Sequence, residues 1–376
     1  MEHYLDNSAT TRVCPEAAEA AMRAMLEAYG NPSSTHTKGR EAKKLLDTAR
    51  KQVSDALGCK PGELYFTSCG SESDNWAIIG GAEYMMRKGR HVITSAVEHD
   101  AVRKSMEELE RRGFEVTYLR PDNSGAVSVE AVEKALRADT ILVSLMLVNN
   151  ETGAITDIPG ISAMLKRNKS MALLHTDAVQ AFMKLPFTPK TLGADMISVS
   201  GHKLHAPKGI GALYISDKIK LKPYIHGGAQ ENGRRAGTEA MPQIAAFGEA
   251  CLVAKQGFKQ NMEHIASLRA MAVEKLSANI PELVLIPGGA EHILSISMPG
   301  WRSEVLMNFL EAKEIYVSRS SACKKGGRSH VLEAMGLDAK VIDGAIRIGL
   351  CRYNMAEDIE ALCEALTQAR NSLAHR

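Results

Sequence analysis

One lysine in this chain has surroundings that could make it a nucleophile. Lys203 ends the run SGHK (200–203), which lies between apolar stretches at 197–199 and 210–214. This pattern predicts a strand, an exposed loop and a second strand. A lysine held in a partly desolvated polar pocket has a lowered pKa and can form a Schiff base with a carbonyl. On this stretch alone, a solvated loop lysine is the alternative.

A second candidate site lies where a predicted strand at 64–67 gives way to a predicted helix over 71–87. The linking residues, FTSCGSES (66–73), are mostly small or hydroxyl-bearing. The free N–H groups and the dipole at such a helix start bind anions, and phosphate is the usual guest. A plain capping box with Ser71 as the cap is the alternative.

Other polar residues follow predicted strands at their carboxyl ends. Asp177 could pair with a protonated ring nitrogen, or could simply cap the next helix. His99 could stack on a ring and pass protons near neutral pH, or could be a satisfied polar residue. Asn149 and Asn150 could serve only to make a turn. The segment GGAQENGRRAGT (227–238) is rich in glycine and carries two arginines, which is weak information by itself.

Together these residues predict one pocket that binds an anion and an aromatic ring. Such parts are what pyridoxal phosphate needs. The helix start and Thr238 would take the phosphate, and Asp177 would take the pyridinium nitrogen. His99 would cover the ring face, and Lys203 would take the aldehyde.

The elements that must position these residues alternate along the chain. Strands are predicted at 64–67, 91–94, 115–119, 141–147, 172–175, 196–199 and 210–215. Helices are predicted at 15–29, 38–57, 71–87, 100–112, 128–137, 158–167 and 238–278. Such alternation predicts a mostly parallel sheet that binds ligands beyond the carboxyl ends of its strands.

The chain changes character after residue 282. Shorter strands are predicted at 283–286, 293–297 and 345–348, with helices at 303–312 and 355–372. We therefore expect a large cofactor-binding domain over 15–260. A smaller α+β domain would combine 1–14 with 261–376 and carry a flexible loop at 316–330.

Composition excludes several classes of protein. The 376 residues are 45% hydrophobic and 24% charged, and the net charge of +2 does not favour nucleic acid or membrane binding. No apolar run approaches the roughly 20 residues of a membrane span, and no signal peptide is expected. Seven cysteines without a CxxC pair fit free thiols in a reducing cytoplasm better than disulfides or a metal site.

The chain resembles the cysteine desulfurases, the NifS/IscS-like branch of the class V aminotransferases with fold type I. The matching motifs occur in order along nearly the whole chain. They are YLDNSATT (4–11), GNPSSTH (30–36), FTSCGSESDN (66–75), EH (98–99), NNETG (149–153), HTDAVQ (175–180), SGHK (200–203), PKGIGALY (207–214), GGAQENGRRAGT (227–238), SSAC (320–323) and AIRIGL (345–350). The resemblance implies a mixed, mostly parallel seven-stranded sheet flanked by helices.

The resemblance also implies roles for individual residues. Lys203 would hold pyridoxal 5'-phosphate covalently, and His99 would stack on its ring. Further cofactor contacts would come from Gly70, Ser71, Asn150, Asp177, Gln180, Ser200 and His202. Thr238 would reach across a homodimer interface to the partner's cofactor. Asn150 and Arg347 would hold the substrate carboxylate, with Asn31 nearby.

The implied reaction converts L-cysteine to L-alanine and leaves a persulfide on Cys323. The acceptor would be an iron–sulfur scaffold or a thiolation enzyme. Lys324, Lys325 and Arg328 follow Cys323, and nearby cations lower a thiol pKa. Selenocysteine lyase or another class V reaction is one alternative, and a non-catalytic sulfur-transfer hub is another. Cys69 stands where the family usually has glycine, which leaves its role open.

Overall fold

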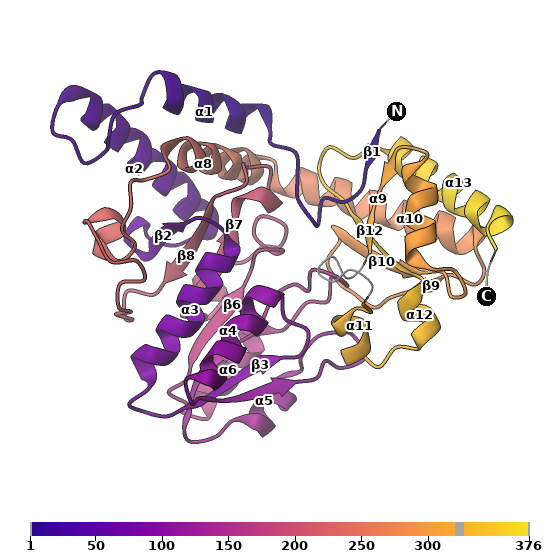
Figure 1. Ribbon diagram of the computed structural model, residues 1–376, viewed down its shortest axis with the longest axis horizontal. Helices are drawn as coiled ribbons and strands as arrows, with labels where there is room; N and C mark the ends of the chain where they lie inside the picture. Colours follow the sequence, from indigo (N-terminus) through magenta and orange to yellow (C-terminus); the bar gives the residue numbers. More distant parts are fainter. Residues whose placement is uncertain (1, 320–326, 375–376) are drawn as a thin grey trace.

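A seven-stranded sheet forms the centre of the larger part of the molecule (Figure 1). The computed structural model describes residues 2–319 and 327–374. The strands are β2 Leu64–Thr67, β3 His91–Ser95, β4 Glu115–Leu119, β5 Thr140–Ser144, β6 Leu173–Asp177, β7 Met196–Ser200 and β8 Gly211–Ile215. Their order is β2-β8-β7-β6-β5-β3-β4, and β8 runs antiparallel to both of its neighbours. The predicted mixed, mostly parallel sheet is therefore confirmed.

Helices cover both faces of this sheet, which explains why its central strands β5, β6 and β7 are buried along their whole length. On one face, α3 (Gly70–Met85) and α4 (Asp100–Arg111) pack against the sheet through residues such as Trp76 and Met106. On the other face, α2, α6 and α8 contribute Leu46, Ile161 and Phe247. The remaining bounds in this part are α1 Pro15–Leu26, α2 Thr37–Leu57, α5 Val129–Ala135, α6 Ile158–Arg167, α7 Pro189–Leu192, α8 Met241–Gln256, η1 Pro61–Glu63, η2 Gly201–Lys203 and η3 Gln230–Gly233.

The smaller part is built on a four-stranded antiparallel sheet in the order β12-β13-β10-β9. A short parallel pair joins β1 to β11. The bounds are β1 His3–Tyr4, β9 Val284–Leu285, β10 Ile293–Ser297, β11 Ile315–Tyr316, β12 Ser318–Arg319, β13 Ala345–Gly349, α9 Phe258–Asn279, α10 Ser303–Glu311, α11 His330–Ala334, α12 Ala339–Asp343 and α13 Ala356–Ser372. Leu5 joins Ile265 and Ile346 in a separate apolar core. Because each part has its own apolar core, we propose that the chain divides into two domains at about residue 260.

Two predictions about secondary structure are wrong. The helix expected over 238–278 is two helices, because α8 ends at Gln256 and α9 begins at Phe258. The loop expected over 316–330 has regular structure at both of its described ends. Ser318 pairs with Arg347 of β13, and α11 begins at His330. Cys323 lies outside the described residues.

The N-terminal segment crosses from the smaller part to the large sheet over β13. The Gly349 N–H donates to the Leu5 carbonyl at 2.6 Å, and the Thr11 N–H donates to the His202 carbonyl at 3.0 Å. A Cβ atom on Gly349 would lie only 2.4 Å from the backbone nitrogen of Ser8. A glycine at position 349 therefore lets this segment lie directly against the sheet.

Gly349→Ala should destabilise the protein by about 1–3 kcal/mol, because the added methyl group must push the backbone at Ser8 away. Urea unfolding measures this loss. Gly62→Ala is the matched control, since an added Cβ there meets nothing within 4 Å, and its effect should stay within about 0.5 kcal/mol. Equal stability of the two variants would show that the close approach at Gly349 is unimportant.

Candidate functional site

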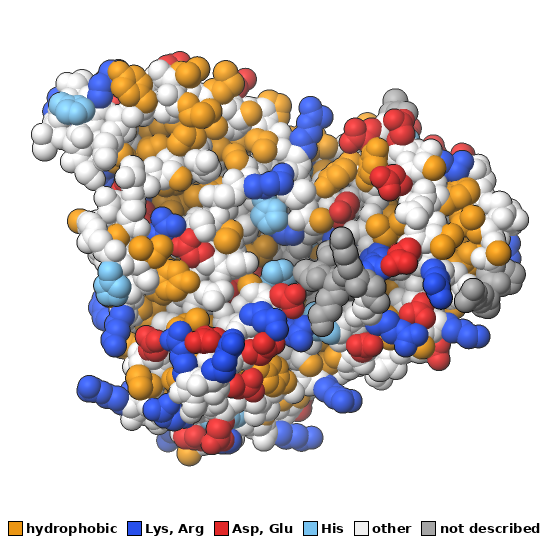
Figure 2. Space-filling view, viewed as in Figure 1, with side chains coloured by type: hydrophobic (Ala, Val, Ile, Leu, Met, Phe, Trp, Pro, Cys, Tyr) orange, Lys and Arg blue, Asp and Glu red, His pale blue; other side chains and the backbone are white. Residues whose placement is uncertain are grey.

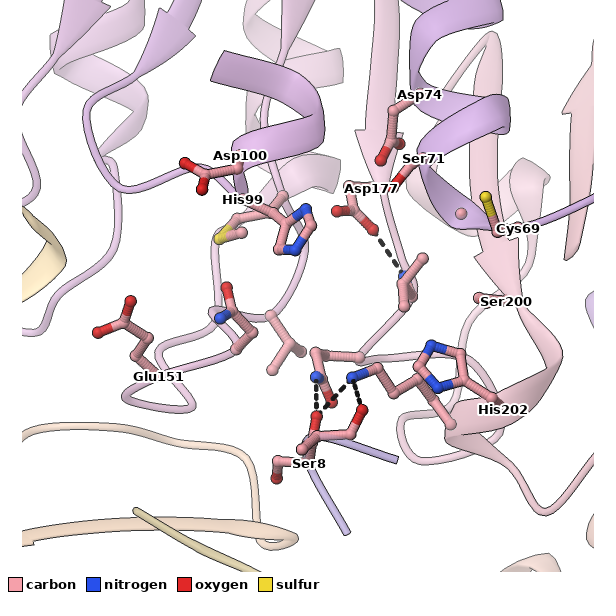
Figure 3. Close-up of a pocket in the computed structure, with 18 of the residues that line it drawn as sticks. Ser8, Cys69, Ser71, Asp74, His99, Asp100, Glu151, Asp177, Ser200 and His202 are labelled. Carbon is pink, nitrogen blue, oxygen red and sulfur yellow. Dashed lines mark hydrogen bonds between the residues drawn. The ribbon is translucent and has the colours of Figure 1, made fainter. Parts of the chain in front are cut away.

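A cavity of about 310 Å³ opens where polar residues follow β3, β6 and β7 (Figure 3). The carboxyl ends of parallel strands are where ligands bind in such sheets. The cavity brings together most of the predicted site residues: Gly70, Ser71, His99, Asn150, Asp177, Gln180, Ser200, His202, Lys203 and Arg347. The strand-end residues singled out in the sequence thus share one site.

Lys203 is held in the short turn η2 that follows β7. Its Nζ donates to the carbonyl oxygens of Ser8 at 2.5 Å and Ala9 at 2.7 Å. Burial, together with the positive charges of Arg347 and Lys184, lowers the pKa of the amine to about 7. Near neutral pH, much of this lysine is therefore a neutral amine that can attack a carbonyl.

Asp177 lies at the end of β6 and points into the cavity (Figure 3). Its Oδ1 accepts a hydrogen bond from the Val179 N–H at 2.9 Å. Burial raises the pKa of this carboxyl group, although His99 and Lys203 oppose the rise. A cationic ring nitrogen would compensate for the cost of burying the carboxylate, so this position suits a pyridinium partner.

His99 is the N-cap of α4, and its ring lies at the cavity (Figure 3). The Ala101 N–H donates to its Nδ1 at 3.1 Å. This bond requires an unprotonated Nδ1, so the neutral ring carries its proton on Nε2. The cap fixes the ring orientation, as a stacking residue requires.

The start of α3 can bind an anion. Cys69, not Ser71, is the N-cap, and its side chain makes no capping hydrogen bond within the described part of the chain. The alternative of a capping box at Ser71 is therefore wrong. A Cβ on Gly70 would lie 2.8 Å from the side chain of Val179. Glycine thus lets the helix start approach the loop after β6, beside Ser200 and His202.

Arg347 reaches the site from β13 of the smaller part. Its Nη1 donates to the Asn150 carbonyl at 2.7 Å, and its Nη2 donates to the Ser318 hydroxyl at 2.7 Å. Asp6 accepts a further bond from Nη2 at 3.2 Å. The Nε atom is buried without a partner among the described residues. A guanidinium fixed in this way suits a carboxylate ligand.

Two predicted residues, Asn31 and Thr238, do not line this cavity. Asn31 lies on an exposed turn, where its side chain accepts a hydrogen bond from the Ser33 N–H at 2.9 Å. A place for Asn31 near the substrate is therefore not supported within one chain. Thr238 is exposed and does not line the cavity. Cys323 lies outside the described ranges.

Several residues of the site were not predicted. The sequence gives no indication that the backbone carbonyls of Ser8 and Ala9 fix Lys203. Asp74 and Glu151 line the cavity as buried carboxyl groups, and His330 reaches it from α11. Glu151 directly follows Asn149 and Asn150 after a predicted strand, and this position could have indicated that Glu151 lies at the site.

The described residues contain neither a membrane-spanning helix nor a cluster of metal ligands. None of the helices in that part is both long and apolar enough to span a membrane. Within the same ranges, no group of three or more His, Cys, Asp or Glu side chains is placed to hold a metal ion.

Comparisons with known proteins cover nearly the whole chain. The family described as Aminotransferase class-V matches residues 3–362. Cysteine desulfurase IscS of Methanosarcina thermophila is 42% identical over 370 residues, which is 97% of this chain and 91% of that protein. A cysteine desulfurase of Trichormus azollae is 40% identical over 370 residues, with 97% and 92% covered. A solved NifS-like protein has a TM-score of 0.94 at 38% identity, covering 99% of this chain and 100% of that one. The structure of SspA in complex with cysteine has a TM-score of 0.82 at 33% identity, covering 94% and 100%.

Glu98 gives a prediction about pH. It is buried beside the site, and its Oε1 accepts hydrogen bonds from the Ser95 hydroxyl at 2.6 Å and the Met146 N–H at 3.1 Å. Burial raises the pKa of Glu98 to about 8. The folded state then holds a proton that the unfolded state has lost, so wild-type stability falls as pH rises from about 5 to 8.

Glu98→Gln has no carboxyl group that can take up a proton. Its amide oxygen can still accept the hydrogen bonds from the Ser95 hydroxyl and the Met146 N–H. Its stability relative to wild type should rise by up to about 1.4 kcal/mol per pH unit over that range. Urea unfolding at several pH values measures the difference. The exposed Glu130→Gln is the control, and its difference from wild type should not grow with pH. Parallel pH curves for Glu98→Gln and wild type would contradict the prediction.

Proposed function

The chain belongs to the class V aminotransferase family and acts as a cysteine desulfurase, and on that premise we propose how its own residues carry out the reaction. The proposal is that pyridoxal phosphate is the cofactor and that sulfur from L-cysteine passes to Cys323 as a persulfide. One observation carries it: Lys203, Asp177 and Arg347 meet in a single cavity.

The cavity fits this cofactor in charge and in shape. The start of α3, with Gly70, Ser71, Ser200 and His202 nearby, offers donors for a phosphate. Asp177 offers a carboxylate for the ring nitrogen, and Lys203 offers an amine for the aldehyde. Asn150 and Gln180 add amide groups to the lining. When bound, pyridoxal phosphate supplies a ring that draws electrons from the bonds at the Cα of an attached amino acid.

The protein groups then hold the substrate and move protons. Arg347 binds the carboxylate of L-cysteine, because its guanidinium is already oriented by Asn150, Ser318 and Asp6. The neutral amine of Lys203 takes the proton from Cα, and His99 would stack on the bound ring and serve as a second proton carrier. The Cβ–S bond of the substrate breaks as a sulfur–sulfur bond to Cys323 forms. The Cβ carbon left behind takes a proton, and Lys203 returns a proton to Cα, which gives L-alanine.

We further propose that the protein is a homodimer in which Thr238 completes the phosphate site of the partner. Thr238 is exposed and lies away from the cavity of its own chain. Hydrophobic side chains gather over α1 (Figure 2), where Met22, Met25 and Leu26 are 55%, 53% and 71% exposed. Exposed apolar faces of this kind mark interaction sites.

The acceptor of the persulfide sulfur is proposed only as a class: an iron–sulfur scaffold or a thiolation enzyme, in the cytoplasm. Selenocysteine lyase activity is the second candidate, because a selenium analogue would make the same contacts with Arg347 and Lys203. Turnover of cysteine, selenocysteine and an amino acid with a keto acid, measured side by side, distinguishes the candidates. A non-catalytic hub would show no turnover with any of them.

Incubation with L-cysteine should add one sulfur atom to Cys323, as detected by peptide mass spectrometry. Cys323→Ala should lower alanine formation by about 100-fold or more, because the sulfur then lacks its nucleophile. Cys59→Ser is the control, since Cys59 is a free thiol that does not line the cavity. Full alanine formation by Cys323→Ala would remove Cys323 from the reaction.

A further inference from the structure

Lys184 is a buried amine to which neither the sequence nor the proposed reaction gives a role. It follows β6 by a few residues, in the turns that lead to α7. Its Nζ is buried and has no hydrogen-bond partner among the described residues. Burial lowers the pKa of the amine to about 8. Near neutral pH, Lys184 is therefore still mostly a cation, and burying a cation without a partner is costly.

Lys184 shares a second, small cavity with Lys203. This cavity has a volume of about 30 Å³, and its lining also includes His205, Cys351 and Arg352. It is large enough for a water molecule. No Asp or Glu from the described ranges lines it. The charge of Lys184 therefore has no carboxylate partner in this cavity. Its electric field instead affects the pKa of neighbouring groups, Lys203 among them.

The effect of Lys184 reaches several groups around this cavity. Its charge contributes to lowering the pKa of Lys203, and also those of His205 and His292, although burial is the larger cause in each case. A lysine placed beside a second cation is a known way to produce a neutral, nucleophilic amine. Lys184 is such a second cation for Lys203, because both residues line the same small cavity.

The other charges around Lys203 come from separate elements. Arg347 on β13 lowers the pKa of its amine, whereas Asp6 in the N-terminal segment and Asp177 on β6 raise it. His202 adjoins Lys203 in η2, and His99 faces the main cavity from α4. A substrate carboxylate bound at Arg347 would offset the charge of that arginine. Lys184 does not line the main cavity, so its charge would persist.

We infer that Lys184 is a positioning residue whose buried charge keeps the Lys203 amine neutral and able to accept a proton while a carboxylate occupies Arg347. The inference deepens the proposed function and rests on it, because only that function requires Lys203 to take a proton with substrate present. The role of Lys184 is electrostatic, so arginine should replace it and a neutral side chain should not.

The test measures the Lys203 amine without turnover. The full chain is freed of cofactor, labelled with acetic anhydride at pH values from 6 to 10 and analysed by peptide mass spectrometry, with acetate present to occupy Arg347. In Lys184→Met, the pKa of Lys203 should rise by about one, which slows its acetylation about fivefold at pH 7. Lys184→Arg should match wild type. Lys190→Met, at an exposed lysine on α7, is the control for loss of a positive charge elsewhere.

Lys184→Gln is prepared in parallel as a neutral variant that can hydrogen-bond to water in the cavity, and thermal unfolding identifies which variants are folded. A pH profile for Lys203 that is unchanged in a folded neutral variant would overturn the inference. So would a Lys184→Arg profile that matches Lys184→Met. Because the readout needs neither cofactor nor cysteine, it can fail while sulfur transfer to Cys323 stands, and the reverse also holds.

Discussion

The site depends on two hydrogen bonds from Lys203 to the carbonyl oxygens of Ser8 and Ala9. Carbonyl oxygens direct the amine without giving it a counter-charge, so Lys203 is held in place and remains easy to deprotonate. Gln180 donates to the same Ser8 carbonyl at 2.9 Å, which ties it to the loop after β6. The N-terminal segment is in turn fixed by its pairing with β11 and its close contact with Gly349. A few residues far from Lys203 in sequence thus connect both parts of the chain at the reactive amine.

The charges around this point are arranged for a ligand with opposite charges at its two ends. Asp177 lies on the side of α3, where the buried carboxyl group of Asp74 also faces the cavity (Figure 3). Burial raises the pKa of Asp74 well above its usual value, and the charge of Asp177 adds to the rise. Arg347 stands on the side of the smaller part. A cationic ring nitrogen and an amino acid carboxylate would complement these two sides.

Much of this architecture could be predicted from the sequence, because strands and helices alternate with clear periodicity and the polar residues follow strand ends. The large sheet and the shared position of Lys203 and Asp177 at strand ends were predicted in that way. Lys184 and the Ser8 and Ala9 carbonyls were not, because their roles come from contacts between segments far apart in the sequence. The pairing of Ser318 with Arg347 was missed for a related reason: a two-residue strand has no periodicity of its own, and only its partner strand β13 defines it.

In the proposed function, Lys203 is the residue to which the cofactor attaches. Reduction of the purified, cofactor-loaded protein with borohydride would make such an attachment permanent, and peptide mass mapping would locate it. We expect a single phosphopyridoxyl adduct on the peptide containing Lys203, and none when Lys203 is replaced by alanine. An adduct on another lysine, such as Lys184, or an unmodified Lys203 peptide would contradict it.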